Sequence, residues 1–216
     1  MDIVTKIGDA FVKGGWAMYL ILGASIFALA IIIERIIILY FRSGINKELF
    51  VREIQKYVLK GDVQKAVNLC STYNVPLSRI TKAGLLKVRG TDEDIQVALD
   101  EAALNEIPRL ERRTGYLGML SNVAVLMGLL GTIIGMIRCF GSVAASSAET
   151  RSTELAKGIS EAMNCTAFGL LVSIPALIAF SIFNGHTQKL VDDIHEASVR
   201  ILNLIVANRS KMGTDA

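Results

Sequence analysis

The sequence predicts an all-α integral membrane protein with three transmembrane helices, of which spans two and three extend into a cytoplasmic helical bundle. Of the 216 residues, 52% are hydrophobic and only 20% are charged, which is less charge than a soluble domain of this length usually carries. Three uncharged stretches, residues 16–33, 114–137 and 162–188, hold 18, 24 and 27 residues. Because about 20 apolar residues cross a hydrocarbon core as a helix, each stretch is long enough to span a membrane.

The first span is assigned to residues 16–41. A signal peptide has a shorter apolar region of about 7–15 residues and ends in a small-residue cleavage site. Here the apolar run is longer and continues into E-R-I-I-I-L-Y-F-R, so we interpret it as a retained helix. Glu34 and Arg35 are expected to be anchors at the cytoplasmic interface, with Arg35 reaching the lipid head groups and Glu34 meeting a nearby basic residue. A functional role for these two residues is the alternative.

The distribution of lysine and arginine predicts the topology, because cytoplasmic loops carry an excess of these residues. Residues 42–113 hold 13 of them, whereas residues 1–15 hold two. We therefore expect a periplasmic N-terminus and a cytoplasmic C-terminus. The remaining segments follow: a cytoplasmic helical segment at 42–113, span two at 114–140, a short periplasmic loop at 141–154, span three at 155–184 and a cytoplasmic C-terminal helix at 185–216.

The cytoplasmic segment is predicted to be helical. Three helices are expected: an amphipathic one that ends at Gly61, a short one that stops before Pro76 and a third that ends at Gly90. Thr91 and Asp94 then give the T-x-x-D spacing of a capping box. From Thr91 we predict one long helix that continues through span two, kinked at Pro108 because proline removes a backbone donor.

The C-terminal helix carries an apolar seam. Its members follow one another at spacings of 4, 3, 4 and 3 residues: Leu190, Ile194, Ala197, Ile201 and Leu204. This is the heptad spacing of a helix packed along another helix. Two partners fit equally well, the extension of span two in the same chain and a neighbouring subunit.

Span two is rich in small residues. Gly128, Gly131 and Gly135 lie at spacings of three and four residues, which allow another membrane helix to approach closely. Thr132 lies among them. A threonine in a helix can donate to its own backbone four residues earlier, so its polarity has a local explanation as well as a functional one.

Span three carries an ionisable residue near its start. An ionisable residue in a membrane helix marks a pathway or a paired site, although Glu161 could also reach interfacial water. Thr166 and Gly169 lie on the adjacent face of the predicted helix. Pro175 interrupts the backbone ladder, which is tolerated when neighbours satisfy the freed carbonyl. Such a partly polar wall makes sense beside a protein-lined cavity whose centre lies outside this chain.

These motifs resemble a known family. M-G-L-L-G-T-I-I-G-M-I-R-C-F at 127–140 and G-I-S-E-A-M-N-C-T-A-F-G-L-L-V-S-I-P-A-L-I-A-F at 158–180 are similar to the paired membrane signature of the MotA/TolQ/ExbB proton-channel family. The size, three spans and helical segment between spans one and two resemble its ExbB/TolQ branch. The sequence leaves open whether the chain is ExbB-like, TolQ-like or a member of a gliding branch.

The resemblance implies a subunit of a proton-driven motor in the bacterial inner membrane. Such subunits form a ring, typically a pentamer, around the membrane helices of two copies of a single-span ExbD/TolR-like partner. The partner's membrane aspartate takes up and releases the proton, and the motion does work on a periplasmic or outer-membrane effector. By this resemblance Thr132 and Thr166 would line the lumen, and Glu161 would shape the proton route.

Other classes of protein fit less well. A membrane scaffold, whose polar residues only lock helices together without conducting protons, is the main alternative. A self-sufficient carrier is disfavoured because the spans show no internal repeat. The sequence shows no nucleophile–base pair, phosphate loop or metal cluster. We therefore expect neither an enzyme nor a cofactor, and no metal site or nucleic-acid partner.

Overall fold

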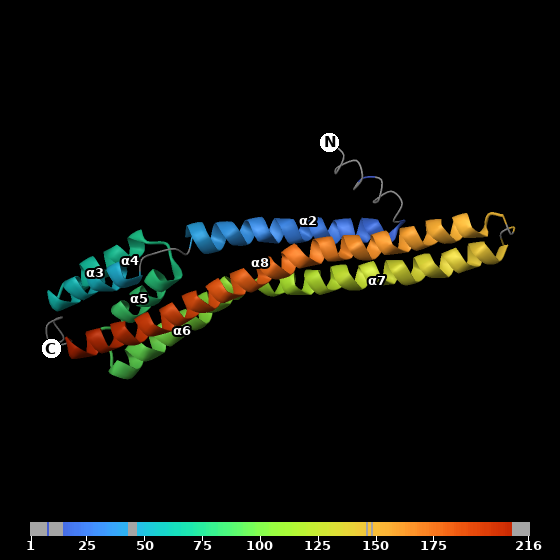
Figure 1. Cartoon of the computed structure of the whole chain (residues 1–216). Coiled ribbons are helices and arrows are strands. Elements are labelled where there is room, and N and C mark those ends of the chain that lie inside the picture. Colours follow the sequence, from blue (N-terminus) through green and yellow to red (C-terminus); the bar gives the residue numbers. More distant parts are fainter. Residues whose placement is uncertain (1–7, 9–14, 43–46, 146, 148, 209–216) are drawn as a thin grey trace. The chain divides into compact units, whose positions relative to one another are not determined.

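The computed structural model describes residues 8, 15–42, 47–145, 147 and 149–208, and the regular elements in these ranges are all helices (Figure 1). They are α2 (Ala17–Ile36), the π-helix η1 (Ile37–Arg42), α3 (Lys47–Leu59), α4 (Val63–Thr72), α5 (Pro76–Leu86), α6 (Asp92–Glu111), α7 (Thr114–Ala145) and α8 (Arg151–Ala207). Three helical stretches are long and apolar enough to cross a membrane: Ala17–Leu39, Asp92–Ala145 and Arg151–Ala207. The predicted all-α fold with three spans is confirmed.

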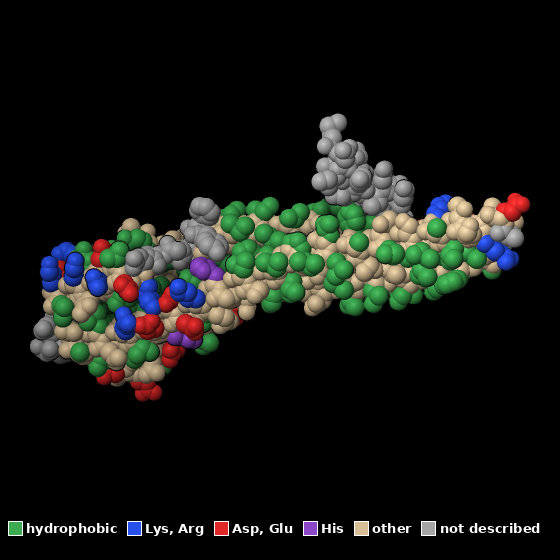
Figure 2. Space-filling model, viewed as in Figure 1, with side chains coloured by type: hydrophobic (Ala, Val, Ile, Leu, Met, Phe, Trp, Pro, Cys, Tyr) green, Lys and Arg blue, Asp and Glu red, His purple; other side chains and the backbone are tan. Residues whose placement is uncertain are grey.

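The chain divides into two units. The spanning unit comprises Met1–Glu34 and Arg113–Ile182, and the bundle unit comprises Arg35–Arg112 and Phe183–Ala216. Figure 2 shows that hydrophobic side chains cover α2, α7 and the first half of α8, whereas charged side chains gather over the helices of the bundle unit. Large apolar side chains such as Phe27 and Leu126 are mostly exposed in the spanning unit. An apolar surface of this extent is suited to lipid rather than to water.

The bundle unit has a core of its own, built from α3 to α6 and the second half of α8. Ile194, Ala197 and Ile201 of the predicted heptad seam are buried in this core, and Leu190 and Leu204 pack against it. The seam therefore packs within the chain. Its same-chain partner is the core formed by α3 to α6 and not the extension of span two alone, and a contact with a neighbouring subunit stays a prediction.

The predicted helix ends in the bundle unit are mostly confirmed. Helix α3 ends just before Gly61, whose φ of 76° lies in the left-handed region that glycine enters without strain. The capping box at the start of α6 is present: the Asp94 amide donates to Thr91 Oγ1 at 3.1 Å, and the Thr91 amide donates to Asp94 Oδ2 at 2.7 Å. Helix α5, in contrast, ends at Leu86, before the predicted stop at Gly90.

The prediction of one uninterrupted helix from the bundle into span two is wrong. Helix α6 ends at Glu111 and α7 begins at Thr114. The Arg112 amide donates to the carbonyl of Pro108 at 2.9 Å, and Arg113 has a φ of 68°. A non-glycine residue in this left-handed conformation ends one helix before the next begins. The interruption lies at Arg112 and Arg113, whereas Pro108 lies inside the last turns of α6.

Glu34 and Arg35 differ in their surroundings. Glu34 forms an ion pair with Arg113, whose Nη1 lies 2.6 Å from Oε2 of Glu34. The predicted basic neighbour of Glu34 therefore exists. Arg35 is 1% exposed and donates through Nη1 to the carbonyl of Leu110 at 2.7 Å. This burial does not match the expectation that Arg35 extends to lipid head groups. Its long stem and a backbone acceptor on α6 hold it inside the bundle unit instead.

Candidate functional site: the seam between helices α7 and α8

Helices α7 and α8 touch through their backbones in the spanning unit. A methyl group on Gly169 would lie 2.7 Å from the carbonyl oxygen of Ala124 and 3.1 Å from Cα of Gly128. A methyl group on Gly128 would lie 3.0 Å from the carbonyl oxygen of Cys165. Glycine is therefore required on both sides of this contact, as in other tightly packed membrane helices.

The same close approach continues along α7. A methyl group on Gly135 would lie 3.2 Å from Cβ of Ala162. One on Gly131 would lie 2.9 Å from Cβ of Cys165 and 3.0 Å from Cβ of Ala17. Gly131 thus lies where α7, α8 and the start of α2 meet.

The hydroxyls of Thr132 and Thr166 lie within this seam. They contact each other, and Thr132 Oγ1 also lies 3.0 Å from the carbonyl oxygen of Ala162 and 3.1 Å from that of Gly128. Thr166 Oγ1 lies 3.3 Å from the Gly128 carbonyl oxygen. The structure thus brings together two site residues that were predicted on separate helices, and both explanations of Thr132 apply because it bonds its own backbone and the neighbouring helix.

The threonine pair has more acceptors than protons. Two hydroxyls supply two protons, whereas the Gly128 and Ala162 carbonyls and the hydroxyl oxygens themselves can all accept. Each hydroxyl can therefore reorient between acceptors, and its oxygen keeps a lone pair for a further donor. Because both side chains remain half-buried, the pair is not sealed from its surroundings. Such a group can hold a water molecule or receive a hydrogen bond from an acid.

A second hydroxyl pair in the seam was not predicted as a site. Ser121 Oγ lies 2.7 Å from Ser173 Oγ and donates to the Ser173 carbonyl at 3.1 Å. The two serines are 1% and 5% exposed, so this pair is closed off by its neighbours. The spacing of each serine from the glycines of its own helix is visible in the sequence. The register between α7 and α8, which brings the two serines together, is not.

Glu161 lies on a different face of α8 from Thr166. It shares its face with Cys165 and Phe168, which pack against Met18 of α2. A methyl group on Gly15 would lie 3.0 Å from Glu161 Oε1, and Gly15 has a φ of 72°. The carboxyl group of Glu161 therefore lies against the turn that starts α2. The structure does not bring Glu161 into the threonine pair.

Two other notable residues of the spans lie outside the seam. Asn122, a polar residue of α7, is exposed. Pro175 lies inside α8 and is also exposed. Neither takes part in the contacts between α7 and α8 described above.

The family follows from comparison with known proteins. Residues 72–196, which include both hydroxyl pairs and Glu161, match the MotA/TolQ/ExbB proton channel family. The chain belongs to this family. Its membership agrees with the resemblance predicted from the two membrane motifs, and relatives named ExbB and TolQ support the ExbB/TolQ branch.

Two of three relatives of this MotA/TolQ/ExbB family member match most of the chain, and the third matches less than half of it. A Synechocystis sp. protein named ExbB-like 3 is 32% identical over 175 residues, 80% of this chain and 82% of the relative. The biopolymer transport protein ExbB of Neisseria meningitidis is 27% identical over 221 residues, 94% of this chain and 97% of the relative. The Tol-Pal system protein TolQ of Pseudomonas aeruginosa is 32% identical over 99 residues, 46% of this chain and 42% of the relative.

The family and the three apolar helices together indicate a multi-pass inner-membrane protein. Its class is that of membrane channel and motor subunits, which energise transport. In this family member, the seam between α7 and α8 places two half-buried hydroxyls, those of Thr132 and Thr166, among close-packed glycines.

Proposed function

We propose that this chain is the ring-forming subunit of a proton-driven motor. The ring, a pentamer in this proposal, surrounds the membrane helices of a single-span ExbD/TolR-like partner. Proton-motive force is converted into mechanical work directed to the periplasm or to an outer-membrane effector. The N-terminus lies in the periplasm, the bundle unit lies in the cytoplasm, and the segment predicted as the short loop between spans two and three, 141–154, lies on the periplasmic side.

The threonine pair is the observation that carries this proposal. Thr132 and Thr166 are the half-buried hydroxyls of a seam that is otherwise closed by glycines and by the buried serine pair. In an assembled ring their accessible side faces the lumen and hydrogen-bonds the partner's acid. Hydroxyls suit this task because they donate to the ionised acid and accept from the protonated one.

The chain needs a partner because its spans two and three lack a carboxyl group where the proton must cross. The uncharged stretches 114–137 and 162–188 contain no aspartate or glutamate. Glu161 directly precedes the second stretch, so it can serve one end of the route but cannot carry a proton through the membrane. An aspartate on the membrane helix of the partner supplies the missing group.

Glu161 acts in this proposal at the entrance of the route. Its contact with the turn at Gly15 joins the start of α2 to α8. A carboxylate held there attracts protons toward the lumen and positions the two helices together. Glu34 and Arg35 have a separate role, since they fix the end of α2 to Arg113 and to Leu110.

A membrane scaffold without proton conduction is the second candidate, and one observation favours it. Ser121 and Ser173 form a hydrogen bond between helices that is buried from both lipid and lumen, so hydroxyls in this seam do lock helices together. The two candidates differ in the role of the threonine pair. In the motor it takes part in proton transfer, and in the scaffold it only joins helices, as the serine pair does.

Native mass spectrometry of the tagged protein, extracted gently from its own membranes, tests the proposal. We expect the mass of a ring plus a small single-span protein whose membrane helix contains an aspartate. The identity of that protein also distinguishes work of the ExbB type from work of the TolQ type. A ring that carries no such protein, even when the single-span partner is co-expressed, would contradict the motor proposal and favour the scaffold.

A further inference from the structure

One face of α6 in the bundle unit is apolar, acidic and exposed. Val97 and Leu104, seven residues apart and therefore on one side of the helix, are 57% and 76% exposed. Glu93, Asp100 and Glu101 flank them and are also exposed. The opposite face of α6 contributes its buried residues to the core of the bundle, so the exposed face is not needed for folding of the unit.

The acidic side chains on this face have no ion-pair partners among the described residues. Glu106, elsewhere on α6, shows the contrast: Arg79 and Arg109 bind its two carboxylate oxygens at 2.9 and 2.7 Å. Glu93, Asp100 and Glu101 make no comparable contact within the part of the chain that the structure describes. Three unpaired carboxylates around two exposed apolar side chains form a surface that a basic groove would complement.

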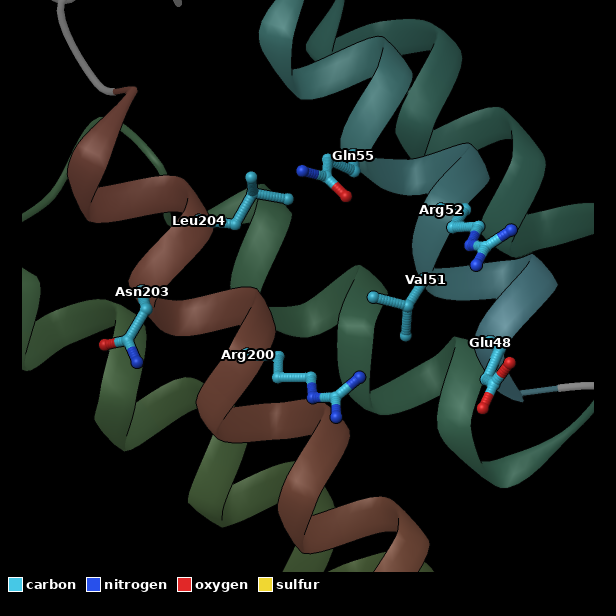
Figure 3. Close-up of a pocket in the computed structure, with 7 residues that line it drawn as sticks. All are labelled: Glu48, Val51, Arg52, Gln55, Arg200, Asn203 and Leu204. Carbon is cyan, nitrogen blue, oxygen red and sulfur yellow. The ribbon is translucent and has the colours of Figure 1, made fainter.

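The bundle unit also contains such a groove, between α3 and α8. Its volume is about 510 Å³, and it is lined by Glu48, Val51, Arg52, Gln55, Arg200, Asn203 and Leu204. Figure 3 shows Val51 and Gln55 on α3 facing Arg200 and Leu204 on α8. Val51 and Leu204 are half-buried and give the groove an apolar floor.

The α3 side of the groove offers two exposed cations, Arg52 and Lys56, although the exposed acids Glu48 and Glu53 lie on the same helix. Arg52 has no ion pair among the described residues, and exposed Lys56 lies one turn further along α3. Arg200 is already paired, since its Nη2 lies 2.5 Å from Oε1 of Glu196, and Glu48 is the acidic lining residue. Arg52 and Lys56 are therefore the cations that remain for an incoming acidic surface.

We propose that the exposed face of α6 in one copy of this chain docks in the groove between α3 and α8 of the next copy. Leu104 or Val97 occupies the apolar floor beside Val51, and the carboxylates of α6 meet Arg52 and Lys56. The chain cannot make this contact with itself, because α4 and α5 pack between α3 and α6 in the bundle (Figure 1). A contact between two different surfaces of identical chains is heterologous, and it produces a ring when the rotation closes. This inference rests on the proposed ring.

Cysteine cross-linking of the full-length protein in membranes tests the contact. The variant with both Val51→Cys and Leu104→Cys is treated with a short bismaleimide and analysed by denaturing electrophoresis. We expect a ladder of oligomers, because each chain then offers both halves of the contact. A mixture of the two single variants can form only dimers, and each single variant alone should stay monomeric.

Two controls make the result specific. The unsubstituted chain, whose three cysteines are buried, measures background. A matched double variant carries Val51→Cys with Leu86→Cys in place of Leu104→Cys. Leu86 is 63% exposed on α5, and we expect no ladder from this variant.

The mass of the oligomer before cross-linking distinguishes a failure of the proposed contact from a failure of the proposed ring. An intact ring with no cross-linked ladder from Val51→Cys and Leu104→Cys would overturn this contact and leave the motor proposal standing. A cross-link that forms only within one chain would overturn it equally. A monomeric mass with no ladder would contradict both the contact and the ring.

Discussion

Gly128 and Gly169 face each other across the seam of the spanning unit, so closely that a methyl group on Gly169 would lie 3.1 Å from Cα of Gly128. The distance to the carbonyl oxygen of Ala124 would be 2.7 Å. Because these neighbours are backbone atoms, they cannot move aside as a flexible side chain could. The hydroxyl pairs of the seam depend on this contact, since it sets the separation and register of α7 and α8.

Substitution Gly169→Ala should therefore destabilise the protein. We expect a loss of about 1–3 kcal/mol, the usual cost of overpacking, measured by thermal unfolding in detergent micelles. Gly185→Ala is the matched control, because Gly185 lies on the same helix with no atom within 4 Å of an added methyl group. It should be neutral or slightly stabilising. Equal losses in both variants would contradict the close contact.

Arg113 combines a left-handed backbone conformation with the ion pair to Glu34. Arg113→Gly and Arg113→Ala both remove the ion pair, but only glycine removes the backbone strain. We expect the glycine variant to be more stable than the alanine variant by about 1 kcal/mol. The comparison uses chemical unfolding of the two variants. Equal stability would mean that α6 continues into α7 without the interruption at Arg113.

The sequence was sufficient for features that depend on local composition. Apolar length predicted the three spans, and the spacing of Thr91 and Asp94 predicted the capping box. The spacing of the glycines also predicted that α7 has a close helical neighbour. Each of these signals lies within one helix and needs no knowledge of another.

Features that depend on how two helices meet could not be predicted. The pairing of Ser121 with Ser173 requires the register between α7 and α8, which one sequence does not contain. The position of Glu161 against the turn at Gly15 requires knowing that α2 packs on that face of α8. The interruption at Arg113 was missed for another reason, since the usual signal for a left-handed residue is glycine or asparagine.

Lys47 connects α3 to α8 in the bundle unit. Its Nζ lies 2.6 Å from Asp193 Oδ1 and 2.6 Å from Glu196 Oε2. The hydrogen bonds to these carboxylates raise the pKa of Lys47, and the hydrogen bond from Lys47 is the main cause that lowers the pKa of Glu196. Lys47→Met should lower the unfolding temperature, more so at low salt because exposed ion pairs are screened. Lys65→Met is the control, since Lys65 pairs only with Asp62 in its own turn.

These shifts also predict a pH dependence. The contribution of Glu196 should be present above its unfolded pKa of 4.5 and lost as the pH falls through the lower folded value. That of Lys47 should be present below 10.5 and lost as the pH rises through the higher folded value. Unfolding temperatures of the unsubstituted protein and of Lys47→Met should therefore converge at both pH extremes. A constant difference across the whole range would contradict the interaction.

Cys70 is buried in the core of the bundle unit, and burial raises the pKa of its thiol to about 12. The unfolded thiol ionises near 9.0. Stability should therefore fall as the pH rises from about 9 toward 12, because the unfolded state releases a proton that the folded state retains. Cys70→Ala should lack this part of the decline in chemical unfolding between pH 8 and 11. Parallel curves for the two proteins would indicate that Cys70 is accessible to solvent.

The central claim is that the threonine pair serves proton transfer while the serine pair only joins helices. Proton flux, measured with a pH-sensitive dye in liposomes that contain the chain and the proposed single-span partner, tests it most directly. We predict that Thr166→Val, which keeps the shape and removes the hydroxyl, abolishes most of the flux while the complex keeps its mass. Ser173→Ala should lower thermal stability but conduct normally. Normal flux through Thr166→Val, in an intact complex, would contradict the claim.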